Sequence, residues 1–238
     1  MNEETVTGKP RPRVGRPAEL DAPRIVATAI ALADEAGLGA ASLTKVAAAL
    51  DVTPMSLYRH IGSKGGLTDL MVDTAFGPPP TIAGDWRPAL REWANGQRAV
   101  FARHPWITRI PVTGPPRGSN ALAWMNAGLA ALRDTGLDWR AKIGAITVVG
   151  GYVRQAFVTD RSIAERRGAD QRSEAQDLDA YQRDVSAVDL SGLPEIAALF
   201  TAQAFADIPP DDESANDDFT FGLELILDGI AAAIARSA

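Results

Sequence analysis

Apolar residues recur every three or four positions along most of the chain, a spacing that predicts amphipathic helices rather than strands. The first run begins after Asp21, with Pro23 suited to the first turn of a helix and Gly37 suited to its C-terminal cap. Its apolar positions are Ile25, Ala29, Leu32, Ala33 and Ala36. The sequence therefore predicts one amphipathic helix between Asp21 and Gly37.

Two much shorter helices are predicted next, joined by only a few residues. Ser42 stands at the expected N-cap of the first, which Asp51 interrupts. Thr53 and Pro54 suit the N-cap and first position of the second, which Gly62 ends. Their inward apolar positions are Leu43, Val46, Ala47, Leu50, Leu57 and Ile61.

The rest of the chain continues in helical runs. Ser63 opens a helix with Leu67, Leu70, Met71 and Ala75 on its apolar side, and GPPP at residues 77–80 stops it. Further helices are predicted over residues 85–105, 119–135, 138–160, 193–206 and 216–236. Residues 161–191 are polar and acid-rich but keep some apolar periodicity, which favours a mobile loop followed by an amphipathic helix.

One segment is open to two interpretations. Residues 145–153, AITVVGGYV, are rich in β-branched side chains around a glycine pair, which is also typical of two strands joined by a tight turn. The helical periodicity runs through this segment from Trp139 to Phe157, and this continuity favours a helix. An all-α fold is expected.

Composition places the chain among soluble globular proteins. Of its 238 residues, 46% are hydrophobic and 23% charged, and no uncharged apolar stretch reaches the roughly 18 residues of a membrane span. The beginning, MNEETVTGKPRPR, lacks the apolar core of a secretory signal, so we expect a cytoplasmic protein with no membrane partner. The chain has no cysteine, which excludes disulfides and thiolate catalysis, and no cofactor or metal is expected.

The formal net charge of −6 is unevenly distributed. Residues 1–66 hold eight Lys or Arg and seven Asp or Glu, whereas the remainder holds sixteen against twenty-three. Residues 1–20 are rich in Pro, Gly and Arg and are interpreted as a flexible basic arm, with Arg13 and Arg16 as candidates for DNA contacts. A solvated tail without a ligand fits the same pattern.

The two short helices and their brief connection have the proportions of a helix-turn-helix unit, whose second helix enters the major groove of DNA. Since Leu57 and Ile61 face inward, other residues of the second helix form its outer side. These are Thr53, Pro54, Met55, Ser56, Arg59 and His60. Arg59 can donate two hydrogen bonds to a guanine, whereas Tyr58, His60 and Lys64 suit phosphate oxygens. Alternatively, Tyr58 is a half-buried packing residue and His60 a surface histidine.

A tyrosine, a histidine two positions later, an apolar residue and then a lysine follow one another as Tyr58, His60, Ile61 and Lys64. With this motif, residues 23–76 resemble the DNA-binding domain of the tetracycline-repressor (TetR) family of bacterial transcription regulators. Three later stretches are similar to the family's C-terminal domain: RHPW at residues 103–106, LDAY at 178–181 and FTFGLELILDGI at 219–230.

The resemblance implies DNA contacts for several residues. Tyr58, His60 and Lys64 would hold phosphates, Ser42, Thr44 and Lys45 would meet the DNA from the preceding helix, and residues 53–59 would read bases. The sequence departs from the family at two places. Asp51 stands where the family usually has Gly, which bears on the tightness of the turn. Gly65 and Gly66 begin the next helix, either as a hinge or as a tolerated weak start.

A homodimer is expected because one helix-turn-helix unit covers only one half-site. The last helix is apolar on two sides, and Phe221 and Leu225 belong to its second side. The alternative is a last helix that is wholly buried within one subunit. By the resemblance, this second side pairs with residues 138–160 in a four-helix seam between subunits. Gly144, Gly150 and Gly151 would permit the close approach.

The resemblance also implies a small-molecule effector bound among the C-terminal helices, in a pocket lined by aromatic and apolar side chains. The candidate contacts are large, central residues of the predicted helices, and the alternative for each of them is a plain core position without a ligand. They are Trp106, Trp124, Met125, Tyr152, Gln155 and Phe157.

We therefore expect a flexible basic arm over residues 1–20, a helix-turn-helix DNA-binding domain over 21–66, and a ligand-binding and dimerisation domain over 67–238. The expected function is a ligand-responsive transcription repressor that binds a palindromic double-stranded DNA operator as a homodimer and is released by a small molecule. The alternative is an all-helical ligand-binding or scaffold protein that does not bind DNA. An enzyme is not expected. The chain has only two histidines and no pair of carboxylates on one helix face, so no set of catalytic residues can be assembled.

Overall fold

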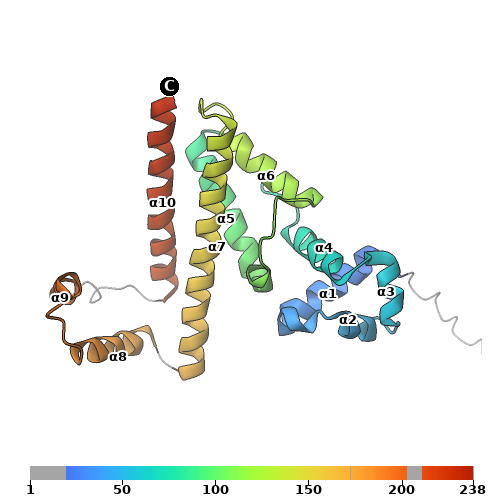
Figure 1. Cartoon of the computed structure of the whole chain (residues 1–238), viewed down its shortest axis with the longest axis horizontal. Coiled ribbons are helices and arrows are strands. Elements are labelled where there is room, and N and C mark those ends of the chain that lie inside the picture. The colour runs from blue at the N-terminus through green and yellow to red at the C-terminus, as the bar shows by residue number, and fades with distance from the viewer. Residues whose placement is uncertain (1–19, 172, 203–210, 238) are drawn as a thin grey trace, which may run out of the picture.

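The computed structural model describes residues 20–171, 173–202 and 211–237, and within these ranges all regular structure is helical (Figure 1). In chain order the elements are α1 (Ala22–Ala36), η1 (Leu38–Ala40), α2 (Leu43–Ala49), α3 (Pro54–Ile61), α4 (Lys64–Phe76), α5 (Trp86–Arg103), η2 (Pro105–Arg109), α6 (Ser119–Ala131), α7 (Trp139–Asp170), α8 (Glu174–Ser186), α9 (Pro194–Thr201) and α10 (Asp211–Ser237). The predicted all-α fold is confirmed. Arg13, Arg16 and the rest of the predicted arm up to residue 19 lie outside the described residues.

Helices α1, α2 and α3 form a small bundle, called the head below, around Ile25, Val46 and Leu57, which are fully buried. Its helix starts were readable from the sequence. The Asp21 carboxylate accepts a hydrogen bond from the backbone N–H of Arg24 at 2.9 Å, as an N-cap does. Thr53 also stands at its predicted N-cap, but its hydroxyl pairs with another hydroxyl, that of Ser56, at 3.0 Å.

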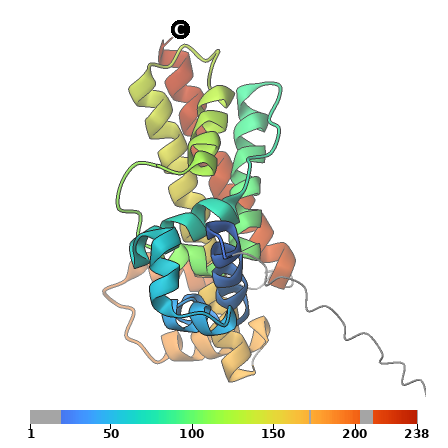
Figure 2. The ribbon, with the colours of Figure 1, turned by 90° about the vertical axis from the view of Figure 1, so that its right-hand side faces the viewer.

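Helices α5 to α10, called the body below, are built around the long helices α5, α7 and α10, and α6 covers one side (Figures 1 and 2). Each long helix contributes fully buried side chains to their shared core: Leu90 from α5, Val149 and Val153 from α7, and Leu227 from α10. At the surface, Arg87 of α5 lies 2.7 Å from Glu224 of α10, and this hydrogen bond holds the pKa of the Glu224 carboxyl below its ordinary value. The two helices are thus joined by both apolar and ionic contacts.

Residues 145–153 are helical, so the interpretation as a strand pair is wrong. The expected loop after residue 160 is also wrong, because α7 continues to Asp170. The last turns of α7 extend past the core, where a helix has no apolar face to bury, and they are stabilised along their own surface by the ion pair between Arg161 and Glu165 at 2.7 Å. Apolar periodicity therefore ends before the helix does.

The amphipathic helix expected within residues 161–191 is confirmed as α8, which Ser173 and Gln176 begin with a reciprocal capping box. In Figure 1, α8 and α9 project from the lower end of α7, away from the head. The Tyr181 and Phe200 rings contact each other with centroids 5.7 Å apart. Helix α8 thus contacts α9 through this ring pair, and none of its described residues belongs to the buried core.

Helix α4 connects the head to the body, and its start resolves the question of the two glycines. A Cβ added at Gly66 would lie 2.5 Å from the carbonyl oxygen of Ile61, whereas a Cβ at Gly65 would meet only the Ser63 hydroxyl, at 3.8 Å. Gly66 is therefore needed for the close turn between α3 and α4, and only Gly65 is a tolerated weak start. Leu70 was predicted on the apolar side of this helix, and that prediction is wrong, because its side chain is 40% exposed.

Gly66→Ala is expected to lower the free energy of unfolding by about 1–3 kcal/mol, because the methyl group must displace backbone. Gly65→Ala is the matched control and is expected to raise it by about 0.5–1 kcal/mol, because alanine favours the helix. Urea unfolding followed by circular dichroism measures both. Equal stabilisation by the two alanines would contradict the close contact.

Candidate nucleic-acid interface and regulatory cavity

The predicted DNA-contacting residues of α2, α3 and the start of α4 share one exposed surface, called the recognition surface below. Leu57 and Ile61 are buried in the head, so the opposite side of α3 faces solvent. Thr44, Lys45, Thr53, Pro54, Met55, Tyr58, Arg59, His60 and Lys64 are exposed, and Ser42 and Ser56 are half-buried. Met55 is 68% and Tyr58 41% exposed, which are large values for side chains of this kind. The Tyr58 side chain is thus accessible from solvent on this surface.

The cationic side chains of the recognition surface are not neutralised within the described part of the chain. Lys45, Arg59 and Lys64 form no ion pair with any described carboxylate. Elsewhere the same residue types are paired, as Arg87 and Arg91 are with Glu224. Exposed unpaired cations on one side of a short helix suit the phosphates of a nucleic acid.

The turn between α2 and α3 forms with an aspartate in the left-handed conformation, since Asp51 has φ 56°. The backbone N–H of Val52 donates to the Ala47 carbonyl at 2.9 Å, and that of Asp51 donates to the Ala48 carbonyl at 3.2 Å. This pair of bonds is the Schellman motif, which satisfies carbonyls at a helix end. The turn is therefore tight without the glycine usual at this position.

A first connection between head and body is a pair of hydrogen bonds to Asp34 of α1. The Trp106 indole Nε1 donates to the Asp34 carboxylate at 2.6 Å, and His104 Nδ1 lies 2.8 Å from the same oxygen. Trp106 is 2% exposed and belongs to η2, at the base of the body. The connection, called the Asp34 latch below, ties η2 to the DNA-binding head.

Asp34→Ala is expected to lower the free energy of unfolding by about 1–3 kcal/mol, because the buried Trp106 N–H loses its acceptor. Glu35→Ala, at the next position of α1, is the control and is expected to change it by less than about 0.5 kcal/mol. Urea titrations of the two proteins and the wild type provide the comparison. An Asp34→Ala protein as stable as Glu35→Ala would mean that the latch contributes nothing.

A second connection joins α4 to the start of α6 through Asp73. Its carboxylate accepts from the backbone N–H of Ala121 at 2.8 Å and, more weakly, from that of Asn120 at 3.4 Å. The N–H groups at a helix start have no partner within the helix and favour negative charge, so a carboxylate from another element suits them. At Gly118 an added Cβ would collide with this carboxylate. No pattern in the sequence indicates this contact between distant elements.

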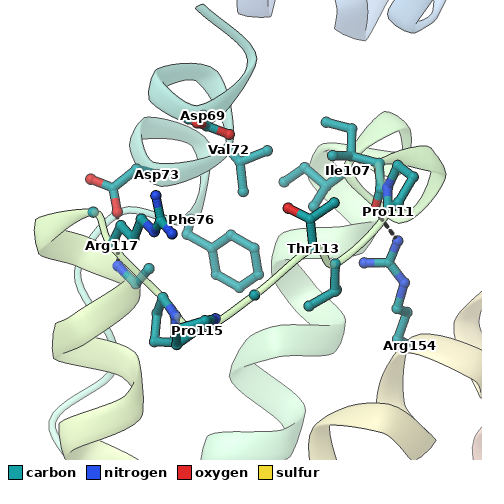
Figure 3. A pocket seen from close by; sticks show the side chains of 16 residues that line it. Asp69, Val72, Asp73, Phe76, Ile107, Pro111, Thr113, Pro115, Arg117 and Arg154 are labelled. Carbon is teal, nitrogen blue, oxygen red and sulfur yellow. Dashed lines mark hydrogen bonds between the residues drawn. The ribbon is translucent and has the colours of Figure 1, made fainter. Parts of the chain in front are cut away.

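A cavity of about 360 Å³ lies between these two connections (Figure 3). Helix α4, η2, the loop over residues 110–118, the start of α6 and Arg154 of α7 surround it. Its apolar lining includes Phe76, Ile107, Ile110 and Pro111, and its charged lining consists of Asp69, Asp73, Arg117 and Arg154. A ligand here would touch both elements that hold the head to the body.

The six predicted ligand contacts do not line this cavity. Trp106 holds the Asp34 latch. The Trp124 indole donates to the Gly77 carbonyl at 3.0 Å, and the Tyr152 hydroxyl donates to the Phe219 carbonyl at 2.9 Å. Phe157 faces the ring of Phe101, and Met125 is partly buried against the core. Gln155 lines a separate hollow of about 260 Å³ on α7. Arg154, a cation within the apolar part of α7, lines the cavity but is not among the predicted contacts.

The outer sides of α7 and α10 leave apolar side chains uncovered in the protomer. Phe221 and Leu225 are 68% and 57% exposed on α10, and Val148 is 56% exposed on α7. A Cβ added at Gly144 or Gly151 would meet nothing within 4 Å. Gly150 is different, since its Cβ would lie 3.5 Å from Gln97 of the same protomer. The expectation that Gly150 faces a partner is therefore wrong.

Two further observations concern sites of other kinds. In the part of the chain that the structure describes, no three or more Asp, Glu or His side chains are grouped so as to hold a metal ion. Among those same residues, no helix has both the length and the apolar character needed to cross a membrane.

Two protein-family descriptions match the chain. Residues 25–70 match "Bacterial regulatory proteins, tetR family", and residues 78–234 match "Tetracyclin repressor-like, C-terminal domain". The first match contains the head and the recognition surface, and the second contains the body. The interval between the two matches falls at the end of α4.

Related proteins are similar over most of their length. The HTH-type transcriptional repressor DrrR1 of Streptomyces coeruleorubidus is 33% identical over 237 residues, which are 97% of this chain and 84% of that protein. The HTH-type transcriptional repressor Rv1353c of Mycobacterium tuberculosis is 27% identical over 222 residues, 90% of this chain and 81% of that one. The solved structure of ActR from Streptomyces coelicolor in complex with (S)-DNPA has a TM-score of 0.72 and 26% identity, and the match covers 91% of this chain and 99% of that chain.

Proposed function

Since the chain belongs to the tetracycline-repressor family of bacterial transcriptional regulators, we propose that it represses transcription by binding a palindromic operator as a homodimer and releases it when a small molecule binds the body. The protein is a DNA-binding regulator and not an enzyme. The observation that carries the proposal is the recognition surface, where a short helix presents Arg59 and its neighbours to solvent without carboxylate partners in the described chain.

On the operator, α3 lies in the major groove with the recognition surface against the DNA. Arg59 donates to a guanine, and Tyr58, His60 and Lys64 hold phosphates on either side. Ser42, Thr44 and Lys45 reach the backbone from α2, and the basic arm with Arg13 and Arg16 adds contacts of its own. In this proposal the arm covers residues 1–20, the DNA-binding domain residues 21–66 and the regulatory domain residues 67–238. A protein with this role acts in the cytoplasm, where bacterial DNA lies.

The homodimer is formed through α7 and α10 of each protomer. Phe221, Leu225 and Val148 are exposed in the protomer, and burying large apolar side chains drives association. Gly144 and Gly151 leave room for a partner helix to approach closely. Two-fold symmetry of the protein then matches the two half-sites of a palindrome.

The effector binds in the 360 Å³ cavity beneath the head. A ligand shifts an equilibrium only if it binds the two states unequally. The position of the cavity supports unequal binding, because Asp73 of its lining caps α6 and its lining element η2 carries the Asp34 latch. A relative, ActR, has been solved in complex with (S)-DNPA. Occupancy of the cavity would alter how the head sits on the body, and so the spacing of the two heads.

A reporter experiment tests the repressor function. Random duplex segments are inserted between a promoter and a fluorescent reporter, and cells that make the protein are sorted for low expression. We expect the sorted segments to share an inverted repeat and to lose repression when Tyr58→Ala replaces the wild type. Shared segments that raise expression would make the protein an activator, and no shared sequence would contradict the regulatory role.

A further inference from the structure

Among the residues that line the cavity, Arg154 is the one that comes from α7. One nitrogen of its guanidinium, Nη2, has a clear structural role. This nitrogen donates to the carbonyls of Thr108 and Ile110, each at 2.6 Å. These carbonyls close the end of η2, where a positive charge is favourable. Figure 3 shows the guanidinium at the edge of the cavity beside Pro111.

The rest of the guanidinium is left without a partner among the described residues. Neither Nε nor Nη1 of Arg154 has a hydrogen-bond acceptor among these residues, and no described carboxylate forms an ion pair with it. Arg154 is half-buried, and burial lowers its pKa below the ordinary value of an arginine. A buried cation without a counter-ion is costly, and another half-buried arginine of the body, Arg87, has two carboxylate partners.

The other charged side chains of the cavity do not neutralise Arg154, which therefore makes the α7 side of the cavity positive. The Asp73 carboxylate is occupied by the N–H groups that begin α6. Asp69 and Arg117 are exposed at the rim, where solvent screens them. Between the rim and Arg154 lie the apolar side chains of Phe76, Ile107 and Ile110. The cavity therefore combines apolar walls with one unpaired cation on the α7 side.

We propose that the cavity binds a small amphipathic organic acid, whose ionised acid group pairs with Arg154 while its apolar part lies against Phe76 and Ile107. This inference rests on the proposed function, because it names the chemical class of the effector. The acid group accepts hydrogen bonds from Nε and Nη1, the two nitrogens that have no acceptor in the described chain. Because Nη2 of the same guanidinium holds η2, the acid is linked through one side chain to the element that carries the Asp34 latch.

Isothermal titration with two matched pairs of compounds tests the inference. One pair is 2-naphthoate and 2-naphthamide, and the other is octanoate and octanamide, so each acid is compared with an uncharged amide of the same shape. With the wild type, at least one acid is expected to bind about ten- to a hundredfold more tightly than its amide, the usual effect of a hydrogen bond to a charged group. Arg154→Gln is expected to abolish that preference. Arg117→Gln, the matched control at the rim, is expected to keep it.

Several results would overturn the inference. These are no binding of either acid, equal binding of acid and amide, or a preference that survives Arg154→Gln but is lost in Arg117→Gln. Arg154→Lys keeps the charge, so it must retain part of the preference, and it replaces Arg154→Gln should the latter fail to fold. Operator binding by the same proteins is measured separately without ligand. A wild type that shows no acid preference but binds its operator refutes only the effector class, whereas absent operator binding in the wild type refutes the proposed function.

Discussion

A Leu225→Glu protein is expected to be a monomer and to bind the operator about 10²–10⁴-fold more weakly than the wild type, because a linked pair of binding units gains about that factor over one unit. Leu225 is 57% exposed in the protomer, on the same side of α10 as Phe221. In the dimer, the added carboxylate would be buried in the seam between subunits without a counter-ion, which is costly. Sedimentation and operator titrations give the two readouts.

The matched control is Leu193→Glu. Leu193 is also exposed, at 47%, but it precedes α9 and does not lie on α7 or α10. This protein is expected to remain a dimer with unchanged operator affinity. A dimeric Leu225→Glu protein would place the subunit contact elsewhere, and monomers in both variants would mean that the substitution acts through folding.

The second large effect is expected at Arg59. Arg59→Ala should cost about 1–3 kcal/mol of operator binding and relax the preference at one base position, since a bidentate contact to guanine provides discrimination of that size. The fold should be unaffected, because Arg59 is exposed and forms no ion pair within the described chain. Binding to operators altered at single positions, measured by fluorescence anisotropy, detects both changes.

Lys64→Ala is the companion variant for a phosphate contact. It should weaken binding to all sequences alike and reduce the slope of log K against log salt concentration by about 0.9. If Arg59→Ala shows this same pattern, Arg59 holds a phosphate and the base is read by another residue of α3.

Features that depend on neighbouring residues in the chain could be predicted from the sequence. Asp21 and Ser42 cap the helices that they precede, Gly37 and Gly62 have φ values of 78° and 72°, and Leu57 and Ile61 are buried. Caps, turn glycines and apolar periodicity all act over a few residues, so the order of residues is sufficient to find them. The three helices of the head followed from such features.

Features that depend on contacts between distant elements could not be predicted. The Asp73 carboxylate accepts a hydrogen bond from the Ala121 N–H at the start of α6, although the two residues are 48 positions apart in the sequence. Arg154 is one of many polar residues of α7, and only the position of η2 gives it a role. The need for Gly66 arises from a carbonyl five positions earlier that turns back toward it. For this reason the predicted ligand contacts are large central side chains, whereas the cavity is lined mainly by α4, η2 and the loop over residues 110–118.

Selection of the purified protein on random duplex DNA, followed by titration of the enriched duplex with wild type and Tyr58→Ala, is the decisive experiment. Tyr58 is 41% exposed on the recognition surface, so its removal tests that surface without disturbing the core of the head. We predict an enriched inverted repeat that the wild type binds and Tyr58→Ala does not. No enriched sequence, or equal binding by both proteins, would contradict operator recognition by this surface and favour an all-helical ligand-binding or scaffold protein.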